Sequence, residues 1–367
     1  MSQLKVNELT NISNTGEPNI ELHQDGSTSI RNLQNLAENV IINPEMKVNQ
    51  RATAVTGNND FPVDRWRITK NDHGAYSGTQ DGDHPPGFGQ SIQISCTTAK
   101  ASLAANSNFV LFQRIEGFNV QPFAKALPGA KPFSVSFWFK TNKQGTYIVR
   151  LLDAVNTRSV SHAFNVTAGF EWVKYTHTFP ADATGGWPST NTNALEFQLW
   201  LCAGSDFTGA PLQTTWGASN SSSNGATGQV NFFDSTNNRA FLTGVQITPT
   251  EAPIEFQHKS IRETISDCQR YFQYVDFWAA NGGVFNADAA WFQYNLNFPV
   301  RMRSTVSFSH ATAYGSTTGT TAFVNKDGNS GTGAAADGVT DTGACMRGAS
   351  AAQTVSLKGR FYYTAEL

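Results

Sequence analysis

The side chains that most often carry catalysis form no recognised catalytic motif in this sequence. The seven histidines have neither the H-E-x-x-H nor the H-x-H spacing of a metal-dependent hydrolase, and the sequence has no G-x-S-x-G elbow and no P-loop. A pair of carboxylates could in principle cleave a glycosidic bond. However, each candidate lies in or beside an expected strand, where an ion pair facing solvent is the commoner role; the candidates are Glu116, Glu171, Glu196 and Glu255. The sequence therefore predicts a protein that is not an enzyme.

Two tryptophans in polar turns suggest glycan binding. Trp187 lies in Gly-Gly-Trp-Pro and Trp216 in Thr-Thr-Trp-Gly, and neither belongs to an alternating strand. An exposed indole ring can stack on the apolar face of a sugar while nearby amides bind its hydroxyl groups. The alternative is that each ring caps the end of a β-sandwich or packs at a subunit interface. Tyr76 and His73, in the Gly-, Asp- and Pro-rich loop 71–89, are further glycan-binding candidates.

No metal site or other cofactor is predicted from the spacing of potential ligands. A structural Ca²⁺ could bind to carboxylates at the strand ends of a sandwich. Nothing in the spacing selects among the candidates, which are Asp60, Asp64, Asp153 and Asp234. The four cysteines lie far apart without a C-x-x-C pair, which disfavours a zinc site. Cys96 and Cys202 could meet in a folded sheet, but a reducing cytosol favours free, buried thiols.

The composition favours a β-rich protein with long polar turns. The chain has 367 residues, enough for two or three domains with cores, and combines 31 glycines with 12% aromatic residues. Only 15% of the residues are charged and the net charge is −2, so the chain presents no field that would attract nucleic acid or a membrane surface. The N-terminus shows neither a signal peptide nor an apolar run of about 18 residues. We therefore expect synthesis in the cytoplasm and no membrane insertion.

Residues 39–250 are predicted to form a jelly-roll β-sandwich. The clearest strand is 133–139, in which aromatic or Val residues alternate with Ser and Trp. Roughly ten strands separated by turns match the number and rhythm of a two-sheet sandwich. They are expected at 65–69, 91–95, 109–116, 133–139, 147–152, 163–166, 172–179, 195–201, 230–233 and 241–247. Trp138 and Trp200 occupy outward positions of their strands, so we expect them to meet a second domain or a neighbouring subunit.

Residues 1–38 are predicted to be an attachment and oligomerisation segment. Short alternating runs around Asp25-Gly26 indicate hairpins. Two or three thin strands cannot bury a core alone, so the segment would be stable in an oligomer or docked on a larger particle. A short helix capped by Ser29 and reaching Val40 is also predicted. The alternative is a disordered tail. The apolar side chains expected to make the contacts are Leu4, Val6, Leu9, Ile20, Leu22, Ile30 and Leu33.

Residues 251–275 are predicted to be a linker and a helix that lead to a smaller C-terminal β domain, 276–367. Ser260 and Glu263 match the S-x-x-E capping box, in which each side chain bonds a free backbone N–H at the start of a helix. An apolar stripe follows at helical spacing and is expected to pack on a neighbouring sheet; it comprises Ile261, Ile265, Cys268 and Phe272. In the C-terminal domain, strands are expected at 292–298, 300–308 and 357–364. A long surface loop is expected over 315–350, with a short hairpin at Phe323-Val324 that ends at Asp327-Gly328.

The same region carries a resemblance to known proteins. The order Gly244-Val-Gln-Ile247, Phe256-Gln-His258, Ser260 to Glu263 and Cys268-Gln-Arg-Tyr-Phe272 resembles many bacteriophage tail-fibre and virion structural proteins. Two further stretches are similar to the same family, namely 42–51 with Asp64-Arg65-Trp66, and 298–303. The resemblance implies a jelly-roll domain like that of carbohydrate-binding modules.

The resemblance also implies a function. A non-enzymatic virion protein is expected, a tail fibre or receptor-binding appendage that binds host cell-surface polysaccharide. Its partners would be other virion tail or capsid proteins, reached through the N-terminus, and two further copies of itself in a homotrimer. Fibres are commonly threefold because thin strands from three chains can enclose one another's apolar faces. One alternative is a capsid-decorating or structural tail protein without glycan binding. The other is a polysaccharide depolymerase, which usually has a long parallel β-helix whose repeat is absent here.

Overall fold

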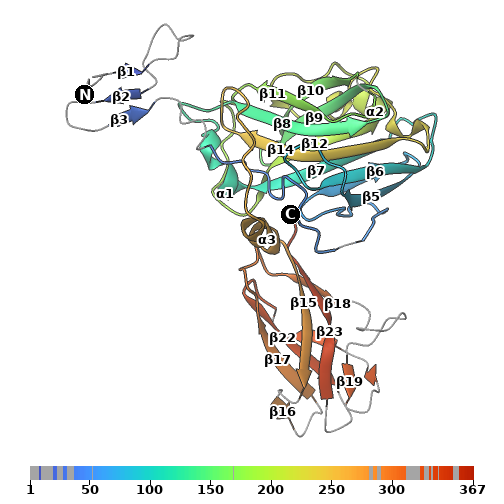
Figure 1. The fold of residues 1–367 in the computed structure, drawn as a ribbon, viewed down its shortest axis with the longest axis vertical. Helices are drawn as coiled ribbons and strands as arrows, with labels where there is room; N and C mark the ends of the chain where they lie inside the picture. The colour runs from blue at the N-terminus through green and yellow to red at the C-terminus, as the bar shows by residue number, and fades with distance from the viewer. Residues whose placement is uncertain are drawn as a thin grey trace, which may run out of the picture.

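The computed structural model describes residues 37–51, 53–167, 169–280, 284–286, 291–310, 323–325, 330–331, 334–337, 339–349 and 355–367, and three short strands nearer the N-terminus. These residues confirm the predicted fold class. The protein is all-β, with a jelly-roll sandwich at its centre, one linking helix and a smaller C-terminal β unit (Figure 1). No helix among the residues described is long and apolar enough to span a membrane.

The first sheet of the sandwich has six antiparallel strands. Their order is β13 (Gly217–Ala218), β10 (Arg158–Val166), β9 (Gly145–Asp153), β12 (Asn193–Ala203), β7 (Asn108–Glu116) and β4 (Arg67–Asn71). The register between β9 and β10 runs unbroken from Gly145 opposite Val166 to Asp153 opposite Arg158. This regular pairing keeps alternate side chains of both strands on the inner face.

The second sheet has five antiparallel strands and packs against the first. Their order is β11 (Val173–Phe179), β8 (Phe133–Thr141), β14 (Arg239–Thr248), β6 (Ser91–Thr98) and β5 (Ala75–Asp81). The alternation predicted for β8 is observed, because Val135, Phe137 and Phe139 are at most 2% exposed and face the other sheet. The rings of Phe137 and Phe197 meet across the interface with centroids 6.2 Å apart. The core of the sandwich therefore lies between these two sheets.

Two predicted features of the sandwich are wrong. Residues 230–233 form no strand; the 3₁₀ turn η4 (Phe232–Asp234) puts both Phe232 and Phe233 into the core. Trp200 does not meet another domain or subunit, because the connection after β12 folds back over it and places Phe207 5.4 Å from its ring.

The other short helical turns are α1 (Gly117–Val120), η2 (Gln121–Phe123), α2 (Ser205–Thr208) and η3 (Ser221–Ser223).

The linking helix α3 (Ile261–Gln269) begins at the predicted residue, but the side of the helix that is buried is not the predicted one. Both hydrogen bonds of the Ser260–Glu263 capping box are present. The predicted stripe is wrong, because Ile261 and Ile265 are 53% and 37% exposed while Cys268 is buried. Cys268 packs, together with Tyr271, on Ile42 and Val48 at the start of the sandwich. Helix α3 therefore docks on this first segment of the sandwich rather than on the face of a sheet.

The C-terminal unit consists of two small antiparallel sheets. One contains β15 (Phe272–Ala280), β23 (Val355–Thr364), β19 (Phe323–Asn325), β20 (Ser330–Gly331) and β18 (Ser307–His310). The other contains β16 (Val284–Asn286), β17 (Trp291–Asn297), β22 (Gly343–Ala349) and β21 (Ala334–Asp337). The hairpin predicted at Phe323-Val324 is confirmed, because β19 pairs with β20. The rest of the predicted loop is wrong over β21 and β22, and the strand predicted at 300–308 begins only at Ser307.

The final residues return to the sandwich (Figure 1). Glu366 forms ion pairs with Arg65 and with Arg51, the latter at 2.9 Å. The carbonyl of Leu367 accepts hydrogen bonds from Arg67 (3.3 Å) and Arg114 (2.9 Å). The C-terminal unit is thus tied to the sandwich at both of its ends, by α3 and by these arginines.

The N-terminal segment contains a three-stranded sheet of β1 (Glu8–Leu9), β2 (Ile20–Leu22) and β3 (Thr28–Ile30). These strands agree with the predicted thin hairpins. Ser29 lies inside β3 and Val40 in extended chain, so the predicted helix is wrong at both ends. Leu4, Val6 and Leu33 lie outside the residues that the structure describes. The predicted contacts of Leu9, Ile20, Leu22 and Ile30 with other chains stay predictions.

Candidate functional site

Trp187 and Trp216 meet at one end of the sandwich. Both rings pack on Phe133 of β8, with centroid distances of 5.9 Å and 5.2 Å. Their indole N–H groups are bonded inside the chain, since Trp187 donates to Asp153 (2.9 Å) and Trp216 to the carbonyl of Pro180 (2.8 Å). Both side chains are half-buried against the core. This geometry favours the alternative that they cap the sandwich; their contact with sugar stays a prediction.

A buried lysine holds the loop that carries Trp187. Lys125 is 4% exposed, and its ammonium group forms ion pairs with Asp153 at 2.8 Å and with Asp182 at 3.1 Å. The ammonium also donates to the carbonyls of Thr184 and Gly185. The Lys125 ammonium also lies 5.4 Å from the centroid of the Trp187 ring. Since these contacts join the end of β9 to the loop that carries Trp187, we infer a structural role for the cluster.

The predicted sugar contacts of His73 and Tyr76 are wrong. Each residue is only 1% exposed, and the two rings pack on Phe109 with centroids 5.1 Å and 4.9 Å away. The Tyr76 hydroxyl donates to the carbonyl of Gly57 at 2.7 Å. Burial lowers the pKa of His73 to about 4, which keeps its ring neutral. The Gly- and Pro-rich composition of the loop gave no sign of this, because β5 begins inside it and carries Tyr76 into the core.

Most of the carboxylates considered for catalysis or for metal binding are separate ion-pair and hydrogen-bond acceptors, while Glu171 and Glu255 are exposed at the surface. Glu116 accepts from Nε and Nη2 of Arg270 (3.2 and 2.8 Å), and Glu196 accepts from Arg114 (2.8 Å). The aspartates are likewise dispersed: Asp60 accepts from Gly57, Asp64 from Arg51, Asp153 from Lys125 and Asp234 from Lys143. Among the residues described, no group of three His, Cys, Asp or Glu side chains could hold a metal ion.

The outer face of the five-stranded sheet carries another group of aromatic side chains. Trp138 projects from β8 away from the core, because its neighbours Phe137 and Phe139 point inward. Phe88, from the connection between β5 and β6, lies against it with ring centroids 6.5 Å apart. Gly244 in β14 permits this approach: its φ is +60°, and a Cβ atom there would lie 2.7 Å from the Phe88 ring and 2.9 Å from Trp138. Trp138 is therefore covered in part by its own chain.

The group extends toward the linker that precedes α3. Phe256 packs on Phe88 with centroids 4.9 Å apart, and His258 packs on Phe256 at 4.8 Å. His258 also shares a hydrogen bond of 2.8 Å with the carboxylate of Glu45, which ties the linker to the first segment of the sandwich. Phe256 is half-buried and His258 is exposed.

On the opposite side the group reaches the chain that leads into β11. Phe170 and Trp172 flank Phe241 of β14, with centroid distances of 5.9 Å and 6.2 Å. In the register of β14 and β8, Phe241 lies opposite Lys140, and Lys140 follows Trp138 by two residues in β8. The six rings thus follow one another across the sheet, and we call them the aromatic face: Phe88, Trp138, Phe170, Trp172, Phe241 and Phe256.

An ion pair lies within the aromatic face. Asp83 accepts hydrogen bonds from Lys140 (2.6 Å) and from the indole of Trp172 (2.8 Å). The Lys140 ammonium also lies 4.5 Å from the centroid of the Phe170 ring. Burial alone would raise the pKa of Asp83, but the hydrogen bonds from Lys140 and Trp172 outweigh it and the pKa is lowered. Asp83 is therefore a carboxylate at neutral pH, set among rings.

The aromatic face combines the two requirements of sugar binding. Phe170 is 40% exposed and Trp138 and Trp172 are half-buried, so these rings can offer apolar surface to a ligand. The adjacent carboxylate and ammonium can accept and donate hydrogen bonds to hydroxyl groups. The sequence indicated that Trp138 faces outward. It did not show that Phe88 lies against Trp138 or that Phe170 and Trp172 flank Phe241, because these rings come from two connections that are far apart in the chain.

Comparisons with known proteins identify similar sandwiches but no family. Neither the protein-family models nor the curated proteins match this sequence. One similar solved structure is the enzymatically active domain of tailspike protein 4 of bacteriophage CBA120, with 13% identity over 58% of this chain and 21% of that chain and a TM-score of 0.32. This chain thus spans about a fifth of that protein.

Two sugar-binding modules are also similar in structure. TmCBM61, solved in complex with β-1,4-galactotriose, is 12% identical over 58% of this chain and 99% of its own, with a TM-score of 0.29. The family 11 carbohydrate-binding module from Clostridium thermocellum, in complex with a β-1,3-1,4-mixed-linked tetrasaccharide, is 7% identical over 55% of this chain and 98% of its own, with a TM-score of 0.28.

Proposed function

We propose that this chain is a non-enzymatic, glycan-binding protein of a bacteriophage virion, a tail fibre or receptor-binding appendage that attaches to host-surface polysaccharide. The observation that carries the proposal is the aromatic face. It places partly exposed rings and the Asp83–Lys140 pair together on one outer sheet surface. The phage assignment rests on the sequence motifs that resemble tail-fibre and virion proteins.

Binding at the aromatic face is tested with the full chain and purified host polysaccharide. The exposed ring is removed in Phe170→Ala and a second ring in Trp172→Ala; Leu127→Ala, at a 62% exposed position outside the aromatic face, is the matched control. Because one ring contact contributes about 0.5–1.5 kcal/mol, each variant should weaken binding by roughly two- to tenfold. The control should bind like the wild type. Unchanged binding by both variants with unchanged melting temperatures would refute this site.

The capping tryptophans provide a second comparison. If Trp187→Ala and Trp216→Ala leave polysaccharide binding unchanged in protein that remains folded, these residues only cap the sandwich. If their loss abolishes binding while the aromatic-face variants retain it, the site is at the end of the sandwich. Either result bears on where the glycan binds, and neither decides against the proposal that the chain binds glycan.

We also propose that residues 1–38 attach the protein to the virion and hold three copies together. The thin sheet β1–β3 has few residues with which to build a core of its own. Light scattering of the full chain should give the mass of a trimer, and deletion of residues 1–36 should give a monomer. A full chain that is monomeric would argue against this role. Immunogold labelling of particles separates a tail appendage from a capsid-decorating protein.

The enzymatic alternative has a direct assay. Incubation with host capsular or lipopolysaccharide sugars should release no new reducing ends, because Glu116 and Glu196 are both engaged in ion pairs. Released oligosaccharide would support a depolymerase instead.

A further inference from the structure

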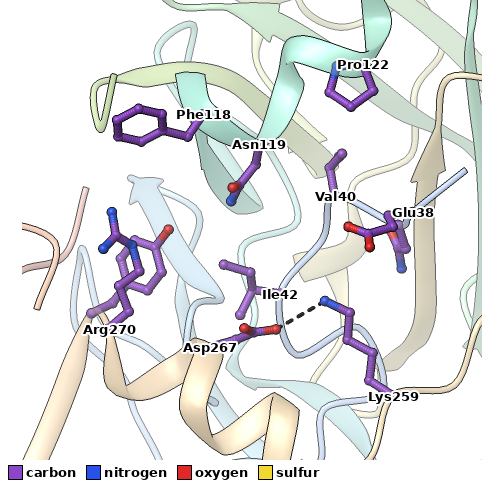
Figure 2. Close-up of a pocket in the computed structure, with 11 residues that line it drawn as sticks. Glu38, Val40, Ile42, Phe118, Asn119, Pro122, Lys259, Asp267 and Arg270 are labelled. Atoms are coloured by element: carbon purple, nitrogen blue, oxygen red, sulfur yellow. Dashed lines mark hydrogen bonds and ion pairs between the residues drawn. The ribbon is translucent and has the colours of Figure 1, made fainter. Parts of the chain in front are cut away.

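A cleft of about 330 Å³ lies where the sandwich meets the linking helix, away from the outer face of the five-stranded sheet. Its walls are α1, the first segment of the sandwich and α3 (Figure 2). Ligand pockets begin at about 300 Å³, so a cleft of this size suits a small ligand. No sequence motif pointed to it, because its three walls are far apart in the chain.

One wall of the cleft is apolar and partly open. Phe118 is 51% exposed although it belongs to the short helix α1. Its backbone N–H donates to the carbonyl of Thr190 at 2.9 Å, which anchors the residue while its ring stays at the surface. Val40, Ile42 and Pro122 continue this wall. An exposed ring at the rim of a cleft can stack on the apolar face of a ligand.

The remaining walls are polar and hold charges of both signs, most of them paired. Lys259 and Asp267 form an ion pair of 3.1 Å, and both side chains are about one-third exposed. In Figure 2, Asn119 projects from α1 on the side of the cleft opposite this pair. Glu38 adds a second carboxylate and Arg270 a second cation. Arg270 is held by two hydrogen bonds to Glu116, of 3.2 and 2.8 Å, so its position is fixed.

The residues that line the cleft favour some ligands over others by the charge of the ligand and by the hydrogen bonds that it can form. Lys259 is paired with Asp267 and Arg270 with Glu116, and Glu38 is exposed to solvent, so the lining offers no concentrated charge of one sign to an ionic ligand. Carboxylates accept hydrogen bonds, the cations donate them and the Asn119 amide does both. A neutral ligand with many hydroxyl groups and an apolar face satisfies all of these groups together.

We infer that this cleft is a second saccharide site, for one or two sugar rings, separate from the aromatic face. The inference deepens the proposed function, since it rests on the chain being a glycan-binding protein, but it uses different residues. Two sites on one chain would let it hold a polysaccharide at two points, which strengthens attachment without a tighter single site.

The test uses full-length protein and the methyl glycosides of glucose, galactose, mannose, rhamnose and N-acetylglucosamine. Each is supplied at about 10 mM, above the Kd of a site that contributes about 4 kcal/mol, and binding is followed by saturation-transfer NMR. At least one glycoside should bind. Phe118→Ala and Asn119→Ala should each weaken that binding by roughly two- to tenfold. Both positions are exposed, so the variants should melt like the wild type.

The controls separate this inference from the proposed function. Phe170→Ala should leave glycoside binding at the cleft intact while it weakens polysaccharide binding, and Leu127→Ala should change neither. If no glycoside binds, or if binding is insensitive to Phe118→Ala and Asn119→Ala, the cleft is not a saccharide site. If instead Phe118→Ala changes only the mass of the oligomer, the cleft receives a neighbouring chain and the inference is overturned.

Discussion

At the scale of single residues, Lys125 shows how a buried charge can organise a surface loop. Its ammonium group joins Asp153, Asp182 and two carbonyl groups, and Arg158 adds two hydrogen bonds of 2.9 and 3.0 Å to Asp182. Burial would raise the pKa of Asp182, but the hydrogen bonds from Arg158 and Lys125 lower it. The loop that carries Trp187 is therefore fixed by charge as well as by packing.

Removal of this ammonium should destabilise the sandwich strongly. Lys125→Ala leaves Asp153 and Asp182 buried with one cation fewer, which costs about 3–5 kcal/mol of the free energy of unfolding. Lys131→Ala removes an exposed lysine from the same region and should cost no more than about 0.5 kcal/mol. Urea denaturation measures both. If Lys125→Ala and Lys131→Ala have equal free energies of unfolding, the contacts of the Lys125 ammonium contribute nothing to stability.

A stacked histidine pair should make stability depend on pH. The rings of His162 and His177 lie 3.6 Å apart and nearly parallel. Burial, with the neighbouring His162, lowers the pKa of His177 from 6.5 to about 4, and burial also lowers the pKa of His162. The folded state thus binds fewer protons than the unfolded chain. The pair's contribution is complete above about pH 6.5 and is lost as the pH falls toward 4.

The variant His177→Gln isolates this effect. Its free energy of unfolding should fall less between about pH 7 and pH 5 than that of the wild type, as measured by urea denaturation across this range. Asp64 acts in the opposite direction, since burial raises its pKa to about 6 and favours the protonated, folded form at low pH. Asp64 is present in both proteins, so its contribution cancels in the difference between their pH profiles. Parallel pH profiles would contradict the assignment.

At the scale of elements, the outer face of the five-stranded sheet depends on one irregular position in β14. The register of β14 against β8 shifts between Thr243 and Gln246, and Gly244 lies at the shift with a φ of +60°. Because Gly244 has no Cβ atom, Phe88 and Trp138 can both lie on its backbone.

A methyl group at this position should disturb the aromatic face. Gly244→Ala adds backbone strain of about 1–2 kcal/mol and a clash with both rings, so it should lower stability and weaken polysaccharide binding. Gly87 also has a positive φ, of +89°, but open space around it. The loss of stability in Gly87→Ala therefore measures backbone strain alone. Any further loss of stability in Gly244→Ala measures the clash with the two rings. Equal losses in the two variants would exclude a role for the ring contacts.

At the scale of the whole molecule, charged side chains tie the sandwich to the C-terminal unit. Arg65 is 2% exposed and pairs with Glu366, which also pairs with Arg51. Arg303 extends the contact by donating to the carbonyls of Asn191 (2.9 Å) and Ala365 (2.8 Å). The Glu366 pairs link residues 301 and 315 positions apart in the chain, and the Arg303–Asn191 bond spans 112 positions.

Loss of this tie should release the C-terminal unit. Glu366→Ala leaves the buried Arg65 without its carboxylate partner, although its hydrogen bond to the carbonyl of Arg114 remains. Proteolysis in the linker before α3 should therefore become faster while the sandwich melts as before. Asp341→Ala removes an exposed ion pair with Arg301 inside the C-terminal unit and is the matched control. A cleavage rate equal to that of the control would show that α3 alone holds the unit.

The sequence alone determined most strands of the sandwich and the start of the linking helix, but it placed a strand at 230–233 and missed β5 and β13. Alternation placed β8 and its inward rings correctly, and the Ser260–Glu263 box marked the beginning of α3, because both signals depend on neighbouring residues. Only the tertiary structure decided which outward and loop residues are accessible. His73 and Tyr76 entered the core and Trp200 was covered by its own chain, while Trp172 came to bond Asp83, 89 positions away. Accessibility depends on such long-range contacts, which no local pattern records.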